Sequence, residues 1–257
     1  MFGSALLYYL VLKPISLLPY FILYRISDFF FIMLYYVIPY RKKVVMANLK
    51  RCFPEKSDQE LKAICRKFYR HFCDLVVESI KNFSITKEEA QKRFVTTNPE
   101  VMNAFAAKGQ AIILTGGHYT NWELWAMAGP LAIDIKVVAI YKKLSNDYFD
   151  KKMRESRGKF GLHMVRTLDT GEYFLRNAHE VNAMVFAIDQ SPSNPKKCVW
   201  IDFMGQETGA LYGAEKYAKD FSRPVVFGRM KRIKRGHYEI SYEVVTEDPR
   251  SFAHGEI

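Results

Sequence analysis

Residues 111–123 read AIILTGGHYTNWE, and this stretch decides the fold. Its first four residues are apolar and predict a buried strand, which the Thr-Gly-Gly sequence at 115–117 ends. Residues 119–128 then have the pattern of a helix. A strand that passes through a glycine turn into a helix is typical of α/β domains, where functional groups gather at the carboxyl ends of parallel strands.

Short apolar runs alternate with helical stretches along the rest of the chain. Ser57 and Glu60 have the spacing of a capping box at the start of a helix over 57–82. Further strands are predicted at 135–141, 184–188, 199–203, 224–230 and 237–245, and further helices from near 86 and at 147–160, 169–178 and 209–220. We therefore predict an α/β domain over 41–257, with a mainly parallel central sheet flanked by helices.

Composition narrows the class of protein. The chain has 257 residues, 49% of them hydrophobic, which is enough to build a packed core and excludes a disordered chain. Its four cysteines are scattered and form no CxxC pair, which argues against a disulfide scaffold or a zinc site. No metal-ligand spacing such as HExxH occurs, so we expect no metal and no cofactor.

Residues 1–40 are the most apolar part of the chain, interrupted by Lys13, Arg25 and Asp28. No small-residue cleavage site follows the apolar run, which argues against a signal peptide. Two membrane arrangements remain open, a spanning or re-entrant helical hairpin and an interfacial anchor with snorkelling cations. A basic segment begins at Arg41, as expected beside a membrane on its cytoplasmic side, although a solvated face of a soluble helix has the same pattern. We favour a membrane-associated helical segment over 1–40.

The glycine turn carries the candidate chemistry. His118 follows the two glycines, and Glu123 lies five residues later. Five residues on a regular helix place two side chains about 140° apart, so these two can meet only if His118 lies in the turn ahead of the helix. A carboxylate beside a histidine fixes its tautomer, and the histidine can then take a proton from a hydroxyl. The alternative is a capping histidine with a solvated Glu123, and spacing alone does not decide between them.

A resemblance to a known family begins at these residues. The stretch from Gly117 to Glu123 resembles the HX4(D/E) motif of the lipid A biosynthesis (lauroyl/myristoyl) acyltransferases, which are relatives of the glycerolipid acyltransferases. The similarity continues in order along most of the chain. It covers Tyr40–Leu49 with Cys52–Glu55, Phe68–His71 with Glu78, Asp189-Gln190, Val199–Phe203, Thr208, Gly213, and Arg223–Val226.

This resemblance implies a glycerolipid-acyltransferase-like fold and a bacterial inner-membrane enzyme with its active site on the cytoplasmic face. It implies transfer of a fatty acyl group from acyl carrier protein to a hydroxyl of an anionic glycolipid, a lipid A precursor. His118 would be the base and Glu123 its partner. Lys142, Arg157 and Asp189 fall at positions where the family pattern suggests substrate binding. Family members continue beyond the position of Ile257, so a C-terminal helix and tail are expected to be missing.

The net charge of +11 suits acidic partners, because both acyl carrier protein and a phosphorylated lipid are anionic. Nucleic acid is the other usual partner of such a basic chain, but no nucleic-acid motif is present and the apolar start of the chain would have no purpose there. Two alternatives stay open. One is an acyltransferase that acts on a lysophospholipid or aminolipid, and the other is a non-catalytic membrane-bound lipid-binding protein.

Overall fold

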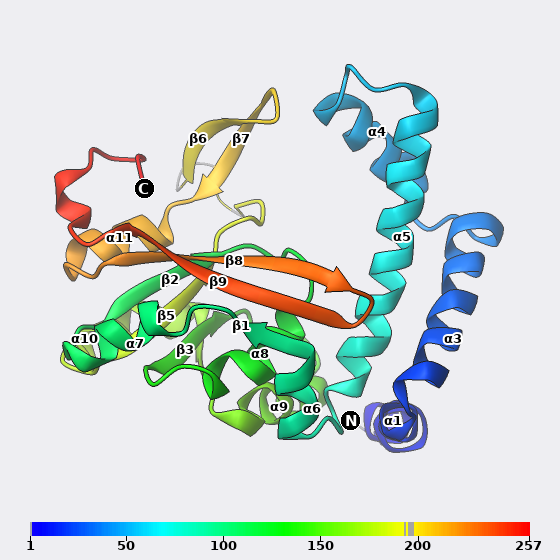
Figure 1. The fold of residues 1–257 in the computed structure, drawn as a ribbon, viewed down its shortest axis with the longest axis horizontal. Helices are drawn as coiled ribbons and strands as arrows, with labels where there is room; N and C mark the ends of the chain where they lie inside the picture. Colours follow the sequence, from blue (N-terminus) through cyan, green and yellow to red (C-terminus); the bar gives the residue numbers. More distant parts are fainter. Residues whose placement is uncertain (1, 193, 195–197) are drawn as a thin grey trace.

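The computed structural model describes residues 2–192, 194 and 198–257, and Figure 1 shows their arrangement. The helices are α1 (Phe2–Leu7), α2 (Lys13–Leu17), α3 (Tyr20–Ile32), α4 (Lys42–Cys52), α5 (Asp58–Lys81), α6 (Lys87–Arg93), α7 (Glu100–Ala107), α8 (Trp122–Ala128), α9 (Asp147–Arg157), α10 (Thr170–Arg176) and α11 (Gly213–Asp220). The strands are β1 (Phe94–Thr96), β2 (Ile112–Gly116), β3 (Lys136–Tyr141), β4 (His163–Arg166), β5 (Asn182–Ala187), β6 (Cys198–Phe203), β7 (Gln206–Leu211), β8 (Val225–Lys234) and β9 (His237–Thr246).

The central sheet has seven strands in the order β1-β9-β8-β2-β5-β3-β4. Strands β8, β2, β5, β3 and β4 run parallel, whereas β9 is antiparallel to β8, and β1 follows the direction of β9. The predicted α/β class with a mainly parallel sheet is thus confirmed. The apolar first part of the segment that decided the prediction forms β2, in the middle of this sheet.

Both faces of the sheet are covered by helices, as the unbroken apolar sequence of β2 requires. Ile112 and Leu114 belong to a core that α7 and α8 complete on one face. Ile113 points to the other face and packs in a second core with α10 and α11. All three side chains are buried, which fixes β2 rigidly between its neighbours and holds the turn that follows it.

The region after β5 differs from the prediction. The segment 199–203 is a strand, but it pairs only with β7 in a separate two-stranded hairpin. The helix predicted over 209–220 begins at Gly213, because residues 206–211 form β7. Met204 and Gly205 both have positive φ angles, as a tight two-residue hairpin turn requires. Strands β1 and β4 and helix α7 were not predicted.

The first helices pack against the long helix α5, seen beside α3 at one end of the sheet in Figure 1. The capping box at the start of α5 is present as predicted, between Ser57 and Glu60. Phe31 and Tyr35 are buried in a third core with Cys65, Tyr69 and Cys73 of α5. Among the described residues, one helical segment, Tyr20–Val37, is long and apolar enough to cross a membrane, and 22% of it is buried within the protein.

Candidate active site

The candidate site lies at the carboxyl ends of β2 and β5, which are neighbours in the sheet. Gly116 of β2 is in register with Ala187 of β5, and two residues further along each chain stand His118 and Asp189. The backbone N–H of Ile188 still donates to the carbonyl of Gly116, so the two strands stay joined up to the site. Parallel pairing therefore brings His118 and Asp189 together across 71 positions of sequence.

Asp189 holds His118 through two hydrogen bonds. The Nδ1 atom of the ring lies 2.7 Å from Oδ1 of Asp189, and the backbone N–H of His118 donates to Oδ2 over the same distance. A carboxylate accepts hydrogen bonds, so Nδ1 is the donor in this contact, and in the neutral ring the lone pair is then on Nε2. The His118 side chain is 29% exposed, which leaves Nε2 accessible to a substrate.

The turn that carries His118 is shaped by close packing. A Cβ atom on Gly117 would lie 3.2 Å from the carboxyl group of Asp189, a tight contact, so glycine favours the close approach of the two strand ends. Thr120 is buried and has a φ of 57°, a backbone conformation that is strained for a β-branched residue. Such strain persists where the surrounding structure imposes it, and it is concentrated at functional sites.

Two further side chains border the ring of His118. Trp122 packs edge-on against it, with 5.1 Å between the ring centroids. The side-chain amide nitrogen of Gln190 lies 3.4 Å from Nε2 of His118. Trp122 restricts the rotation of the ring, and Gln190 lies beside its second nitrogen.

Glu123 lies in the first turn of α8 and pairs with Arg157 of α9. The guanidinium donates two hydrogen bonds to the carboxylate, Nε to Oε2 at 2.9 Å and Nη2 to Oε1 at 2.5 Å. Burial opposes the charge of Arg157, but the hydrogen bonds and the negative charge of Glu123 outweigh it and raise the pKa of Arg157. This two-pronged contact fixes both side chains beside the His118 turn.

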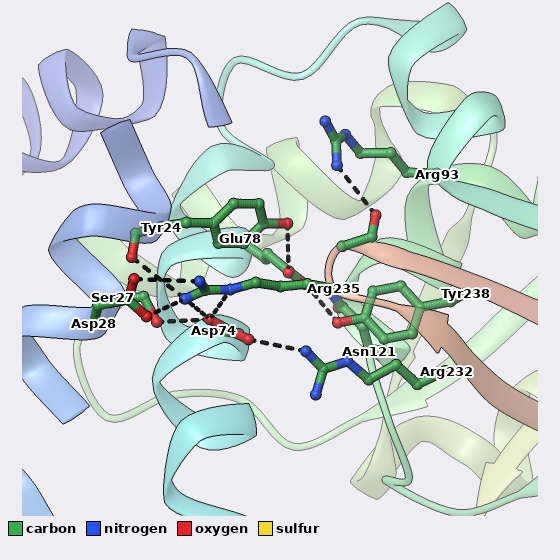
Figure 2. A network of polar contacts seen from close by, with 11 residues as sticks. Tyr24, Ser27, Asp28, Asp74, Glu78, Arg93, Asn121, Arg232, Arg235 and Tyr238 are labelled. Carbon is green, nitrogen blue, oxygen red and sulfur yellow. Dashed lines mark hydrogen bonds and ion pairs between the residues drawn. The ribbon is translucent and has the colours of Figure 1, made fainter. Parts of the chain in front are cut away.

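The start of α8 is tied to the protein interior through Asn121. Its side-chain oxygen accepts from the backbone N–H of Leu124 and caps the helix, while its amide donates to Glu78 of α5 over 2.6 Å. Glu78 also accepts from Tyr24 of α3 and Tyr238 of β9, as Figure 2 shows. Burial raises the pKa of the Glu78 carboxyl, and these three donors partly offset that effect. The turn is thus anchored to three other elements.

A cavity of about 350 Å³ opens next to the Glu123–Arg157 pair, between the first helices, α5, β3 and α9. Its size is within the range of small-ligand sites. Among the residues described, no cluster of three or more His, Cys, Asp or Glu side chains is arranged to hold a metal ion. The cavity is lined by apolar side chains that include Leu12, Phe83, Phe149 and Met153, and by the cations Lys142, Arg154 and Arg157.

The model of a known family, described as bacterial lipid A biosynthesis acyltransferase, matches residues 2–251, nearly the whole chain. The chain belongs to this family. The lipid A acyltransferases are a bacterial, membrane-associated family of enzymes, so the match identifies the chain as an acyltransferase. No curated protein matches the sequence significantly.

The structure places the predicted site residues of this acyltransferase in two groups. His118 and Asp189 form one, whereas Glu123 and Arg157 form the other, which Lys142 joins along the wall of the cavity. Among the described residues, no hydrogen bond joins His118 to Glu123, although these two were expected to pair. His118 does lie ahead of the helix, which begins at Trp122, as the spacing argument required.

Some contacts of this site were not anticipated. Gln190 and Trp122 border His118, and Asn121 joins the turn that carries it to Glu78. Asn121 could have been found from sequence, because asparagine directly before a helix is a common N-cap. The pairing of Glu123 with Arg157 spans 34 positions and has no local signal.

Proposed function

We propose that this protein transfers a fatty acyl group from the thioester of acyl carrier protein to a hydroxyl of a lipid A precursor. The family membership supports acyl transfer within lipid A biosynthesis. The observation that carries the mechanism is the pair of hydrogen bonds between His118 and Asp189 at the carboxyl edge of the sheet. Asp189 occupies Nδ1, so Nε2, which has only the long 3.4 Å contact to Gln190, is the nitrogen that we assign as the base.

In the proposed reaction, Nε2 of His118 removes the proton from the acceptor hydroxyl, and the oxygen attacks the thioester carbonyl carbon. The resulting tetrahedral intermediate collapses as the carbon–sulfur bond breaks, and the proton on Nε2 passes to the leaving thiolate. Asp189 holds the ring and stabilises the imidazolium in between. Asp189 thus takes the orienting role that the sequence pattern assigned to Glu123, since the Glu123 carboxylate is engaged by Arg157.

Glu123 then acts through Arg157, which it fixes at the edge of the cavity. Lys142, Arg154 and Arg157 line the cavity together with Asp150, which pairs with Arg154, and with the apolar side chains of Leu12, Phe83, Phe149 and Met153. A cavity of this character fits a hydrocarbon chain whose head carries developing or permanent negative charge. We assign the acyl chain to the apolar part and the charged groups of donor or acceptor to the cations.

The proposed setting is the inner membrane, with the site on the cytoplasmic face, where acyl carrier protein is available. The excess of 38 Lys and Arg over 27 Asp and Glu favours encounter with an acidic carrier protein and with an anionic lipid. No nucleic acid and no cofactor take part in the proposed reaction.

The test is turnover by the purified full chain in lipid vesicles, followed as thiol release from acyl carrier protein with a lipid A precursor as acceptor. Base catalysis typically contributes about 10²–10⁴-fold, so His118→Ala should lower the rate by that factor. The matched control is His179→Ala, an exposed histidine remote from the site, which should keep the wild-type rate. Thermal unfolding of both variants shows that they remain folded.

Wild-type turnover in His118→Ala would reject the mechanism. The absence of thiol release in the wild-type protein with every acceptor would favour the non-catalytic lipid-binding alternative. Mass spectrometry of lipids from a strain without the gene tests the acceptor. Loss of one acyl chain from lipid A supports the proposal, whereas unchanged lipid A with altered phospholipids or aminolipids points to the other acceptor class.

A further inference from the structure

The candidate span Tyr20–Val37 is attached to a charged helix along its whole length. Helix α5 lies beside it in the opposite direction, and each turn of the span contacts a different level of α5. At one end, Lys81 donates a hydrogen bond to the carbonyl of Leu18, just before the span. Further along, Tyr24 donates to Glu78 and Ser27 donates to Asp74. At the other end, Arg70 lies over the ring of Phe31, and Tyr35 donates to the carbonyl of Lys62.

These contacts argue against an orientation in which Tyr20–Val37 crosses the membrane. A helix of 18 residues is about 27 Å long and would occupy most of a hydrocarbon core of about 30 Å. Because α5 runs alongside this segment over its whole length, the charged residues of α5 would lie at the same depths in the bilayer. Asp74 and Glu78 would be near its centre, with Lys62, Arg66, Lys67 and Arg70 on the following turns. Charged side chains at such depths are strongly disfavoured.

A second element is fixed at the middle of the same helix. Arg235, at the tip of the β8–β9 hairpin, donates to Asp28 at 2.7 Å and to Asp74 at 2.6 Å, and Arg232 donates to Asp74 at 3.0 Å. Figure 2 shows this network between the helices and the hairpin. Asp28 lies at the centre of the candidate span, so a perpendicular helix would take the tip of the central sheet into the middle of the membrane.

The opposite face of the helix has a different character. Phe21, Arg25, Phe29 and Ile32 of α3 lie within about 80° of one another around a regular helix. With Tyr36, in the π-helical segment Met33–Val37 that follows α3, they are exposed and form a set that we call the outer stripe. Phe21 is 70% exposed, and Phe29 and Tyr36 are 58% and 57% exposed. The buried positions Leu23, Ser27 and Phe31 face the other way, toward α5. An exposed apolar stripe that contains a single arginine fits the interface of a bilayer.

We propose that α3 lies in the plane of the membrane, with its outer stripe immersed in one leaflet and its inner face bound to α5, so that it does not cross the bilayer. The partner is an anionic phospholipid surface, because Arg25, Arg41 and Lys43 are exposed beside apolar side chains of the same segment. In this arrangement residues 1–40 pack against the domain over 41–257 and lie between it and the membrane. The inference depends on the membrane association of the family and on none of the catalytic roles.

The test measures immersion depth with nitroxide labels on the full chain in vesicles of phosphatidylethanolamine and phosphatidylglycerol. Single cysteines replace Phe21, Phe29 or Tyr36, and the half-buried Cys52 and Cys198 are changed to serine, whereas Cys65 and Cys73 are buried and remain. Collision rates with oxygen and with a water-soluble nickel chelate give the depth of each label. Leu168→Cys, in the short turn Thr167–Asp169 directly before α10 and 95% exposed, is the control.

An in-plane helix predicts the same depth for all three labels, about 5–10 Å below the headgroups, and a water-exposed label at 168. A spanning helix predicts a label at 29 that is deeper than those at 21 and 36 by about 10 Å. That profile would overturn the proposal, and so would labels that stay in water or are covered by a second copy of the chain. The depths are read without turnover, so a failure of the proposed reaction leaves this result unaffected.

Discussion

Asp189 contacts His118 with both carboxylate oxygens, one to the ring and one to the backbone. A residue that holds both the ring and its backbone fixes the direction of Nε2 as well as the tautomer. Glu123 is close in sequence but contacts Arg157, so its effect on His118 is indirect. These two carboxylates therefore differ in what their removal should do.

We expect Asp189→Asn to lower kcat by about 10²–10⁴-fold, because an amide can no longer stabilise the imidazolium. Glu123→Gln keeps an acceptor for Arg157 and should cost much less, with part of the loss in KM. Steady-state thiol release measures both. The control is Asp220→Asn in an exposed ion pair with Lys216, which should leave both constants unchanged. A larger loss of kcat in Glu123→Gln than in Asp189→Asn would restore the pairing of His118 with Glu123.

The sequence alone identifies His118, Glu123 and Asp189 as site candidates, but it does not identify their partners. The five-residue spacing of His118 and Glu123 is visible locally, which favoured a pair within the motif. The contact with Asp189 depends on β2 and β5 being adjacent and in register, and strand order is not encoded in either strand. Knowledge of that one adjacency would have been enough to predict the pair.

At the scale of elements, α5 carries an unusual histidine. Both ring nitrogens of His71 are buried and have no hydrogen-bond partner among the described residues. Burial, together with the positive charge of Arg232, lowers the pKa of His71 from 6.5 to about 4, against the opposite effect of Asp74. The histidine is therefore neutral in the folded protein over a pH range where the unfolded chain takes up a proton.

This difference makes His71 a source of acid sensitivity. Between pH 6.5 and about 4, the unfolded state binds more protons, so stability falls as the pH is lowered. His71→Leu should remove this contribution and lose less stability between pH 7 and 4.5, by on the order of 2 kcal/mol. The difference corresponds to roughly 4–8 °C in the midpoint of thermal unfolding. His179→Leu should behave as the wild type, and parallel curves for all three proteins would contradict the prediction.

Elements with a clear local signal were predicted well, and those without one were missed. Ser57 and Thr86 mark the starts of α5 and α6 through side-chain caps that are present in the structure. Strand β7 was taken for the start of a helix because its turn is Met204-Gly205, which lacks the Asn-Gly or Asp-Gly signal of tight hairpins. Strands β1 and β4 are three and four residues long, too short for a periodic pattern to be visible.

At the scale of the whole molecule, the ion pairs of Arg235 join the first helices to the last strands. Asp74 is almost fully buried, and Arg235 and Arg232 supply its positive partners. Removal of Arg235 leaves this carboxylate with fewer donors, and Asp28 loses the same partner. Paired buried charges of this kind become destabilising when one partner is lost.

Arg235→Gln should therefore lower the free energy of unfolding by about 1–3 kcal/mol. The matched control is Arg229→Gln on β8, whose pair with Glu243 is 65% and 63% exposed and should contribute less than about 1 kcal/mol. Thermal unfolding in mild detergent compares the two. Equal shifts would show that the hairpin contributes no more to stability than an ordinary surface pair.

The contact between Asp28 and Arg235 spans 207 residues, which affects how the chain matures. A ribosome adds about 5–20 residues per second, so about 10–40 s pass between the synthesis of Asp28 and that of Arg235. During this interval the first helices carry unshielded aromatic surface and an unmatched aspartate. We expect the lipid surface or a chaperone to bind these first helices during synthesis. The β8–β9 hairpin then packs against helices that are already at the membrane.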